Sequence, residues 1–293
     1  MLSIIIPSRN EIFLEKTIRD ILEKATGEIE VFPILDGYEP PANEIVDDPR
    51  VKYIRLEKQD YTQKRHGINQ AVDMAKGEYV MSVDAHCMFA KGFDEVLVRD
   101  HQPNWVQVPR RHRLDAENWC IQEQSDDRPP IDYEYVMYPG NFDRPALHGF
   151  KWDERTKERA DIMIDDIMTM QASTWFMTKA WYKKMGFMQI EGFSGWGQEA
   201  EEICFKTWMR GGECKVNKNT WYAHLHKGRK YGRMYYMSRE SNRKCYAYSY
   251  DYFMNNRDEQ RVHDFDWLID KFMPIPKWKK DWRERLDYNK DKK

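Results

Sequence analysis

Two side chains that could bind a metal ion lie close together in the first third of the chain. Asp84 and His86 are two residues apart in "YVMSVDAHCM", directly after an apolar run that is typical of a buried strand. Because every second residue of an extended chain returns to the same face, both side chains can point at one site. A carboxylate with an imidazole suits a borderline cation such as Mn²⁺, and less obviously Mg²⁺, which prefers oxygen ligands. Alternatively, Asp84 caps the next turn and His86 is an ordinary polar loop residue.

A second stretch, residues 192–233, combines a glycine-rich turn, a helical pattern and a strand with two histidines. It reads "GFSGWGQEAEEICFKTWMRGGECKVNKNTWYAHLHKGRKYGR". A glycine-rich turn leads through Trp196 and Glu199 into a predicted helix over residues 200–209, and two glycines end that helix. The strand predicted to follow carries His224 and His226, which alternate onto the same face.

The elements that must position these residues alternate along the first half of the chain. Apolar, β-branched runs predict strands over residues 2–7, 29–36, 51–56 and 78–84, and helical spacing predicts helices over residues 10–25 and 62–77. This order indicates an α/β fold with a mostly parallel sheet and helices on its faces. Ligands bind such sheets at the carboxyl ends of the strands, where Asp36 and Asp84 lie.

The rest of the chain is less regular. Residues 110–161 are polar and too long for an idle connection, so we expect them to shape a binding site. Residues 167–178 predict a pair of strands, and residues 179–186 a short helix. From about residue 234 the composition shifts to Tyr, Arg and Asn, followed by two short helical patterns. We therefore predict a main domain over residues 1–233 and a partly helical extension over residues 234–293.

The composition predicts a globular protein of the cytoplasm. Apolar residues make up 41% of the chain and charged residues 33%, and no apolar run approaches the roughly 18 residues of a membrane span. The five cysteines are odd in number and never spaced as CxxC, which favours free thiols in a reducing compartment.

Together the two motifs resemble those of GT-A glycosyltransferases, most closely the polypeptide N-acetylgalactosaminyltransferases. Members of that family carry Asp-x-His-Cys after a buried strand, as "DAHC" does here. They also carry a Trp-Gly-Gly-Glu-Asn turn, a helix of the Phe-Arg-x-Trp type, a Gly-Gly end and a later histidine, to which "WGQEAEEICFKTW", "GG" and His224 correspond. The resemblance runs loosely from residue 2 to about residue 233. It implies a GT-A fold and a metal-dependent transfer of a sugar from a nucleotide-sugar donor.

The resemblance also implies roles for individual residues. Asp84, His86 and His224 take the places of three ligands of Mn²⁺ or Mg²⁺, with His226 as the competing third ligand. Lys227 stands where the family places a cation on the donor diphosphate, and Glu199 where it places a glutamate on the sugar. Glu199 could instead be a carboxylate that the dipole stabilises at the start of a helix. Trp196 could face the sugar or pack in the interior.

The nucleotide end of the site is implied by the loop after the first strand. The segment "PSRNE", with Pro7, Arg9 and Asn10, resembles the start of the family's site, and Asp36 resembles the acid that reads uracil. A cation expected on the second helix is missing at Ile68, and Lys64 or Arg65 can supply it. The expected donor is therefore a UDP-sugar.

Departures from the family leave the sugar and the acceptor open. The asparagine that follows the family's glutamate is Ala200 here, and a Gly-Gly pair beneath the sugar becomes Ser173–Thr174. We expect a hydroxyl acceptor other than a protein of the secretory pathway. Whether the anomeric configuration is retained or inverted stays open as well.

A basic, tyrosine-rich tract, residues 227–250, allows further hypotheses. Cations interleaved with aromatic rings are typical of nucleic-acid surfaces. Arg239, Arg243 and Lys244 could thus hold a nucleic-acid acceptor, such as a hydroxymethylated base in modified viral DNA. Alternatively, the tract clamps the donor and packs the extension.

Two other functional classes are a sugar-nucleotide nucleotidyltransferase and a nucleic-acid-binding protein without catalysis. The first usually has a glycine-rich basic loop that "PSRNEIF" lacks. The second does not need Asp84, His86 and His224.

Overall fold

The structure is a computed structural model that describes residues 1–122, 129–141, 146–193 and 197–290. The strands are β1 (Leu2–Ser8), β2 (Ile29–Asp36), β3 (Ile54–Leu56), β4 (Tyr79–Val83), β5 (Cys87–Phe89), β6 (Trp105–Asp115), β7 (Cys120–Ile121), β8 (Glu134–Val136), β9 (Gly149–Lys151), β10 (Ile164–Asp166), β11 (Thr174–Thr178) and β12 (Glu213–His224). The helices are α1 (Leu14–Lys24), α2 (Lys64–Met74), α3 (Phe93–Arg99), α4 (Asp153–Glu158), α5 (Lys179–Met185), α6 (Glu199–Met209), α7 (Gly228–Tyr231), α8 (Arg239–Met254), α9 (Phe265–Phe272) and α10 (Trp282–Lys290).

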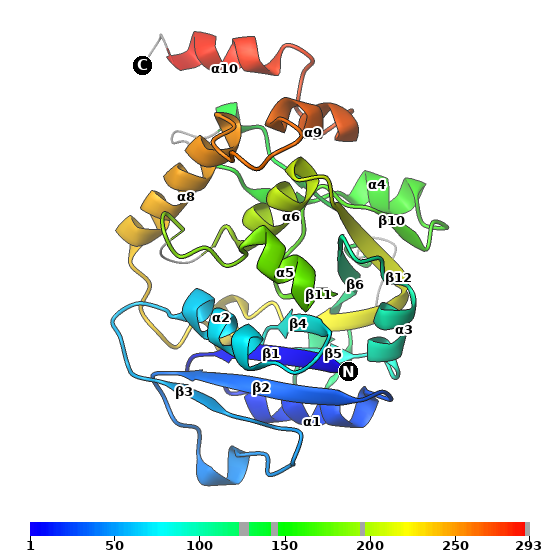
Figure 1. Cartoon of the computed structure of the whole chain (residues 1–293), viewed down its shortest axis with the longest axis vertical. Coiled ribbons are helices and arrows are strands. Elements are labelled where there is room, and N and C mark those ends of the chain that lie inside the picture. The colour runs from blue at the N-terminus through cyan, green and yellow to red at the C-terminus, as the bar shows by residue number, and fades with distance from the viewer. Residues whose placement is uncertain (123–128, 142–145, 194–196, 291–293) are drawn as a thin grey trace.

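A large mixed sheet forms the centre of the molecule, with the strand order β10-β12-β6-β11-β4-β1-β2-β3. The first half of the chain is parallel, as predicted: β1 pairs in parallel with β2 and β4, and β2 with β3. The strands β1 and β2 are buried along almost their whole length, as parallel strands between two layers require. Helices α1 and α2 lie on opposite sides of these strands (Figure 1).

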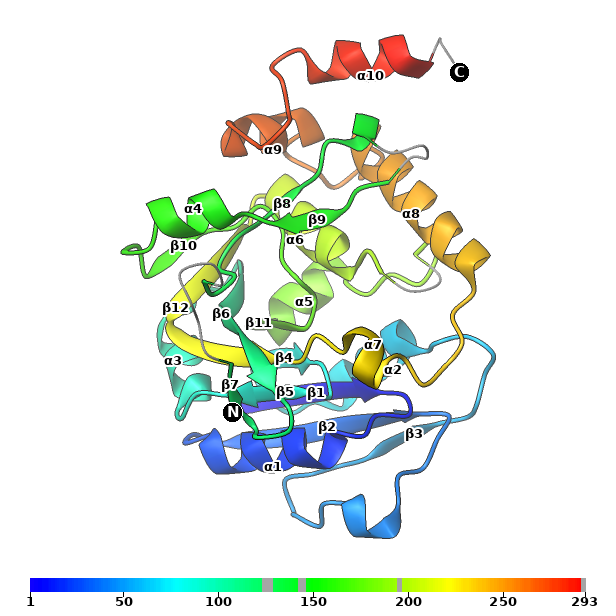
Figure 2. The same ribbon diagram turned by 180° about the vertical axis from the view of Figure 1, so that it is seen from behind.

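The second half of the chain adds antiparallel pairing. Strand β11 runs antiparallel between β4 and β6, and β12 runs parallel to β6 and antiparallel to β5. The predicted strand pair over residues 167–178 is wrong, because only β11 forms there. The polar stretch of residues 110–161 contains the end of β6, β7, the antiparallel pair β8–β9 and α4. The back view shows β8 and β9 crossing in front of α6 (Figure 2).

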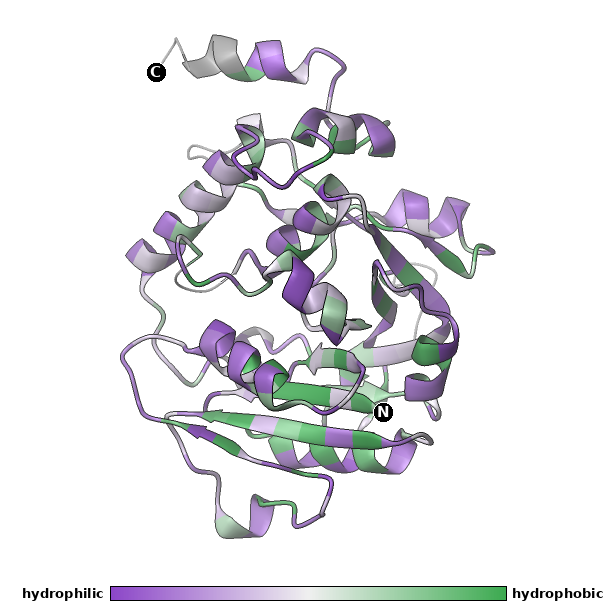
Figure 3. Ribbon diagram, viewed as in Figure 1, coloured by the Kyte–Doolittle hydropathy of each residue, from purple (hydrophilic) through white to green (hydrophobic). Residues whose placement is uncertain are grey.

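The C-terminal helices continue the core of the sheet. Phe253 of α8, Phe265 of α9 and Trp282 of α10 belong to the same hydrophobic cluster as the central strands. Hydrophobic residues concentrate in β1 and β2, whereas hydrophilic ones dominate much of α8 (Figure 3). Within the described ranges, no helix is both long and apolar enough to cross a membrane.

Candidate active site

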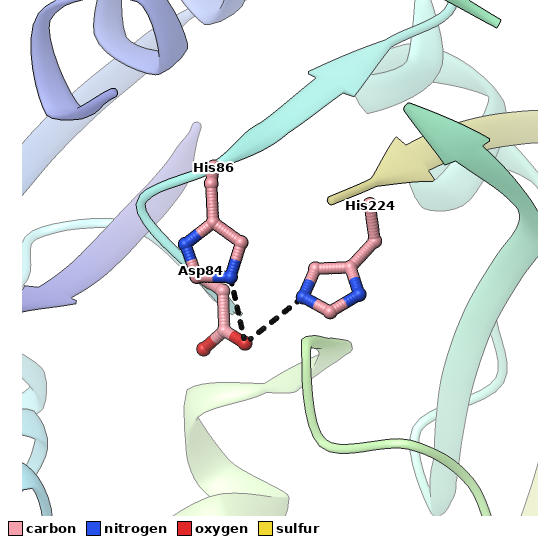
Figure 4. A group of neighbouring side chains, drawn as sticks. All are labelled: Asp84, His86 and His224. Atoms are coloured by element: carbon pink, nitrogen blue, oxygen red, sulfur yellow. Dashed lines mark ion pairs between the residues drawn. The ribbon is translucent and has the colours of Figure 1, made fainter. Parts of the chain in front are cut away.

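The three candidate metal ligands come together at the ends of β4 and β12. Asp84 follows β4, His86 precedes β5, and the pairing of His224 with Cys87 in the β12–β5 register brings its ring beside them. Their candidate ligand atoms all lie within 4.8 Å of one another. Oδ2 of Asp84 is 3.4 Å from Nε2 of His224 and 3.9 Å from Nε2 of His86, so both rings turn toward one carboxylate oxygen (Figure 4).

The chemistry of this cluster suits a divalent cation. Neither ring nitrogen of His224 has a hydrogen-bond partner in the described part of the chain, although the side chain is buried. Burial lowers the pKa of His224 to about 3 against the opposing pull of Asp84, so its ring is neutral and keeps a free lone pair. Burial alone would raise the pKa of Asp84, but Lys64, His224 and His86 outweigh it and hold the group ionised. One carboxylate with two imidazoles is a donor set for a borderline metal such as Mn²⁺.

A second carboxylate supports His86 from behind. Oε2 of Glu11 lies 3.3 Å from Nδ1 of His86, and its Oε1 pairs with the ammonium of Lys227. A carboxylate attracts the proton to Nδ1, which leaves the lone pair of Nε2 on the side of Asp84. Burial raises the pKa of Glu11, but His86 and Lys227 outweigh that effect and lower it. From the sequence, Glu11 was not identified as a site residue. Its place in the loop after β1 was the available signal.

Lys64 joins the metal-ligand cluster to the start of α6. Its Nζ lies 2.7 Å from Oε2 of Glu199 and 3.4 Å from Oδ1 of Asp84. These two acids raise the pKa of Lys64 despite its burial, so it carries a positive charge. The other oxygen of Glu199, Oε1, is buried and has no hydrogen-bond partner within the described ranges. Glu199 therefore offers one oxygen to Lys64 and keeps one for a ligand.

Arg65, the other expected cation on α2, faces away from this cluster. Its guanidinium pairs with Glu202, donates to the carbonyl of Gln189 at 3.1 Å and lies 5.0 Å from the ring centre of Phe193. The lining of the cleft includes Lys64 but not Arg65. Neighbouring residues of a helix point about 100° apart, which separates the two cations. The structure thus places Lys64, and not Arg65, at the cleft where a nucleotide was expected.

The expected nucleotide end is organised around Asp36. Its Oδ2 lies 3.3 Å from Nη1 of Arg9, and Gln63 donates to both carboxylate oxygens at 3.0 Å. Arg9 also donates to the carbonyls of Gln59 and Tyr61. A carboxylate has about four lone-pair positions, so Asp36 keeps capacity for one further donor.

The three candidate metal ligands open onto one cleft of about 910 Å³, which reaches Asp36 and Arg9 and is within the usual size range for ligand sites. It is lined by Pro7, Arg9, Glu11, Asp36, Lys64, Asp84, His86, Glu199, His224, His226 and Lys227. Asn10 is not among the lining residues and donates to the carbonyl of Met234 at 2.7 Å. Trp196 lies outside the described residues.

The basic tract divides into two parts. Lys227 lines the cleft, whereas Arg239, Arg243 and Lys244 lie on α8 outside its lining. Lys244 pairs with Glu240 at 2.8 Å, and both side chains are mostly exposed. The opposite side of α8 is buried, with Cys245 and Phe253 in the core.

Comparison with known proteins finds similarity to glycosyltransferases. The model of the family "Glycosyl transferase family 2" matches residues 3–135. Polypeptide N-acetylgalactosaminyltransferase 12 of Mus musculus is 25% identical over 248 residues, which is 76% of this chain and 39% of the relative. Polypeptide N-acetylgalactosaminyltransferase 5 of Caenorhabditis elegans is 25% identical over 249 residues, or 78% of this chain and 37% of the relative. The chain thus spans less than half the length of these curated relatives.

Two solved structures share the fold. The crystal structure of GalNAc-T7 with UDP, GalNAc and Mn²⁺ superposes with a TM-score of 0.65 at 17% identity, covering 90% of this chain and 52% of that one. The S. aureus TarS 1–349 structure in complex with UDP-GlcNAc gives a TM-score of 0.57 at 13% identity, covering 93% of this chain and 71% of that one. The chain therefore has the glycosyltransferase GT-A fold, matches glycosyl transferase family 2 over residues 3–135, and resembles the polypeptide N-acetylgalactosaminyltransferases.

Proposed function

We propose that the protein is a metal-dependent glycosyltransferase that moves a sugar from a UDP-sugar to a hydroxyl acceptor. The observation that carries this proposal is the cluster of Asp84, His86 and His224 in a cleft that continues to Asp36 and Arg9. The relatives and the two solved structures, one with UDP and Mn²⁺ and one with UDP-GlcNAc, support the donor and the metal.

Asp84, His86 and His224 would hold the cation, Mn²⁺ or Mg²⁺, which when bound supplies a Lewis acid for the diphosphate leaving group. Glu11 orients His86 through Nδ1 and at the same time holds the ammonium of Lys227 at the edge of the cleft. A positive charge there stabilises the negative charge that develops on a departing nucleoside diphosphate.

Glu199 and Asp36 would bind the two ends of the donor. Glu199 lines the cleft with a buried oxygen that has no hydrogen-bond partner among the described residues, which suits a sugar hydroxyl. Asp36, fixed by Arg9 and Gln63, would accept the imide proton of uracil with its remaining capacity. Burial of both carboxylates strengthens these hydrogen bonds, because the surroundings are less polar than water.

The proposal is tested by metal-dependent hydrolysis and binding. A panel of UDP- and GDP-sugars is screened for hydrolysis with and without Mn²⁺, and Mn²⁺ binding is measured by calorimetry. We expect hydrolysis of a UDP-sugar that needs the metal and is lost in Asp84→Ala and His224→Ala. His226→Ala is the matched control for the ligand assignment. Loss of Mn²⁺ binding in His226→Ala but not in His224→Ala would make His226 the ligand, and no metal-dependent turnover of any donor would refute the proposal.

A further inference from the structure

The wall of the cleft formed by β8, β9 and the start of α6 carries a pair of carboxyl groups that the proposed mechanism does not use. Oε1 of Glu201 accepts a hydrogen bond from the backbone nitrogen of Gly149 at 3.2 Å. A Cβ atom on Gly149 would lie 3.4 Å from Oε2 of Glu134 and 3.6 Å from Oε1 of Glu201. Both carboxyl groups therefore lie against the same glycine, and all three residues line the cleft.

The two acids of this wall are in different electrostatic states. Glu134 is paired with Arg111 at 2.6 Å. Glu201 is buried and has no ion pair with a cation in the described part of the chain. Burial, helped by the nearby charges of Glu134 and Glu199, raises the pKa of Glu201 to about 7. Near neutral pH it is thus in part a carboxylic acid, which can donate a hydrogen bond as well as accept one.

A buried amide beside the pair points to a ligand independently. The side chain of Gln198 is buried and donates through Nε2 to the carbonyl of Leu147 at 2.9 Å. Its Oε1 has no hydrogen-bond partner within the described ranges, although Gln198 lines the cleft. A buried acceptor without a partner is costly unless a ligand or a water satisfies it. On the same wall, the rings of His148 and Tyr246 pack with their centroids 4.6 Å apart.

These features favour a neutral ligand with hydroxyl groups. Arg111 beside these acids is already paired with Glu134, and none of Glu134, Glu201 and Gln198 carries a positive charge, so a phosphate or another anion finds no charge partner among them. Sugar hydroxyls both donate and accept, which matches the amide oxygen of Gln198 and a protonated carboxyl group. Aromatic side chains supply apolar surface for the C–H face of a sugar ring.

We propose that Glu201, Glu134 and Gln198 form a subsite for a neutral, hydroxyl-bearing sugar ring; this inference rests on the proposed glycosyltransferase function. The ring has two possible sources, the sugar of the donor or a carbohydrate acceptor. In either case Glu201 determines specificity, because it rejects anionic rings and contacts hydroxyl groups.

The test measures binding of free sugars by saturation-transfer NMR. The probes are methyl glycosides of glucose, galactose, mannose, N-acetylglucosamine and N-acetylgalactosamine, added to the full chain with UDP and diamagnetic Mg²⁺, which leaves both sugar positions open. We expect at least one glycoside to bind, Glu201→Leu to weaken it at least about tenfold, and Glu201→Gln to stay within about threefold, because the amide keeps a donor and an acceptor. Glu240→Leu on the exposed side of α8 is the matched control.

A non-hydrolysable phosphonate analogue of a UDP-sugar distinguishes the two sources. If it displaces the glycoside, the subsite holds the donor sugar; if the glycoside still binds, the subsite holds the acceptor. Calorimetry of UDP with Mn²⁺ on each variant tests folding and the proposed function separately. If Glu201→Leu does not fold, Gln198→Leu takes its place. The subsite is refuted if no glycoside binds, if a sugar phosphate binds as tightly as the neutral sugar, or if the leucine variant binds unchanged.

Discussion

Replacing Lys64 with methionine tests whether this side chain neutralises the two acids that face the cleft. The ammonium lies between Glu199 and Asp84, at 2.7 and 3.4 Å from their oxygens. Methionine keeps much of the length and removes the charge. Lys64→Met then leaves two carboxylates facing the same space without the cation that pairs with both.

The expected loss of stability follows from the burial of the three side chains. Two unit charges about 4 Å apart attract by about 4 kcal/mol at an effective dielectric constant of about 20, and desolvation offsets part of this. Removing one partner of a fully buried ion pair costs about 3–5 kcal/mol. The side chains of Lys64, Glu199 and Asp84 retain 22%, 9% and 26% of their exposure. We therefore expect a smaller loss of about 1–3 kcal/mol in the free energy of unfolding.

The assay is thermal unfolding with and without Mn²⁺. For a chain of this size, a loss of about 1–3 kcal/mol lowers Tm by roughly 2–10 °C. Because a divalent cation on Asp84 supplies the missing positive charge, Mn²⁺ should raise the Tm of Lys64→Met more than that of the unmodified chain. Lys24→Met removes a lysine from the Glu23–Lys24 pair on α1 and serves as the control. An unchanged Tm, or the same Mn²⁺ shift in both proteins, would refute the role of Lys64.

Three further predictions concern Glu199, Glu201 and α8. Glu199→Gln keeps the shape of the side chain but loses the charge that pairs with Lys64, so donor turnover should fall at least about tenfold, on the order of 1.4 kcal/mol. Calorimetry should show UDP binding little changed, and near-normal turnover would leave Glu199 as a helix-start carboxylate only. The fold raises the pKa of Glu201 to about 7, so the stability that this side chain contributes is lost as the pH rises from its unfolded pKa near 4.5 through 7. Glu201→Gln should therefore have a higher Tm than the unmodified chain at pH 8 but not at pH 4. A Tm difference that stays constant across pH would contradict the raised pKa. Replacing Arg239, Arg243 and Lys244 together with alanine should leave metal-dependent donor hydrolysis intact, since all three are exposed and outside the cleft lining; loss of hydrolysis in a folded variant would place α8 in the donor site.

Features of the site that depend on local pattern could be predicted from the sequence. The alternation of apolar runs and helical spacing up to residue 84 indicated β1, α1, β2, β3, α2 and β4, and all six elements are present. The end of a strand is visible in its residues, so the positions of Asp36 and Asp84 were predicted as well. The family resemblance implied that His224 lies near Asp84, but the pairing of β5 with β12 that brings them together was not predicted.

Contacts between distant segments were decided by the tertiary structure. From the sequence either Lys64 or Arg65 could supply the cation, and Arg65 was expected at the nucleotide. The rotation of α2 instead turns Lys64 into the cleft and Arg65 toward Glu202. Glu11 stands in the segment "PSRNE" but was not singled out there, and only the fold shows that it lies between His86 and Lys227.

The subsite around Glu201 shows the same limit most clearly. Its carboxyl group contacts Gly149, on the same cleft wall as the amide of Gln198, only because β9 packs across the start of α6. The sequence by itself determined which elements form and where the strand ends place their acids, because those depend on spacing along the chain. Which side chains share a charge, a proton or a cleft depends on packing between segments far apart in sequence, and only the tertiary structure could decide that.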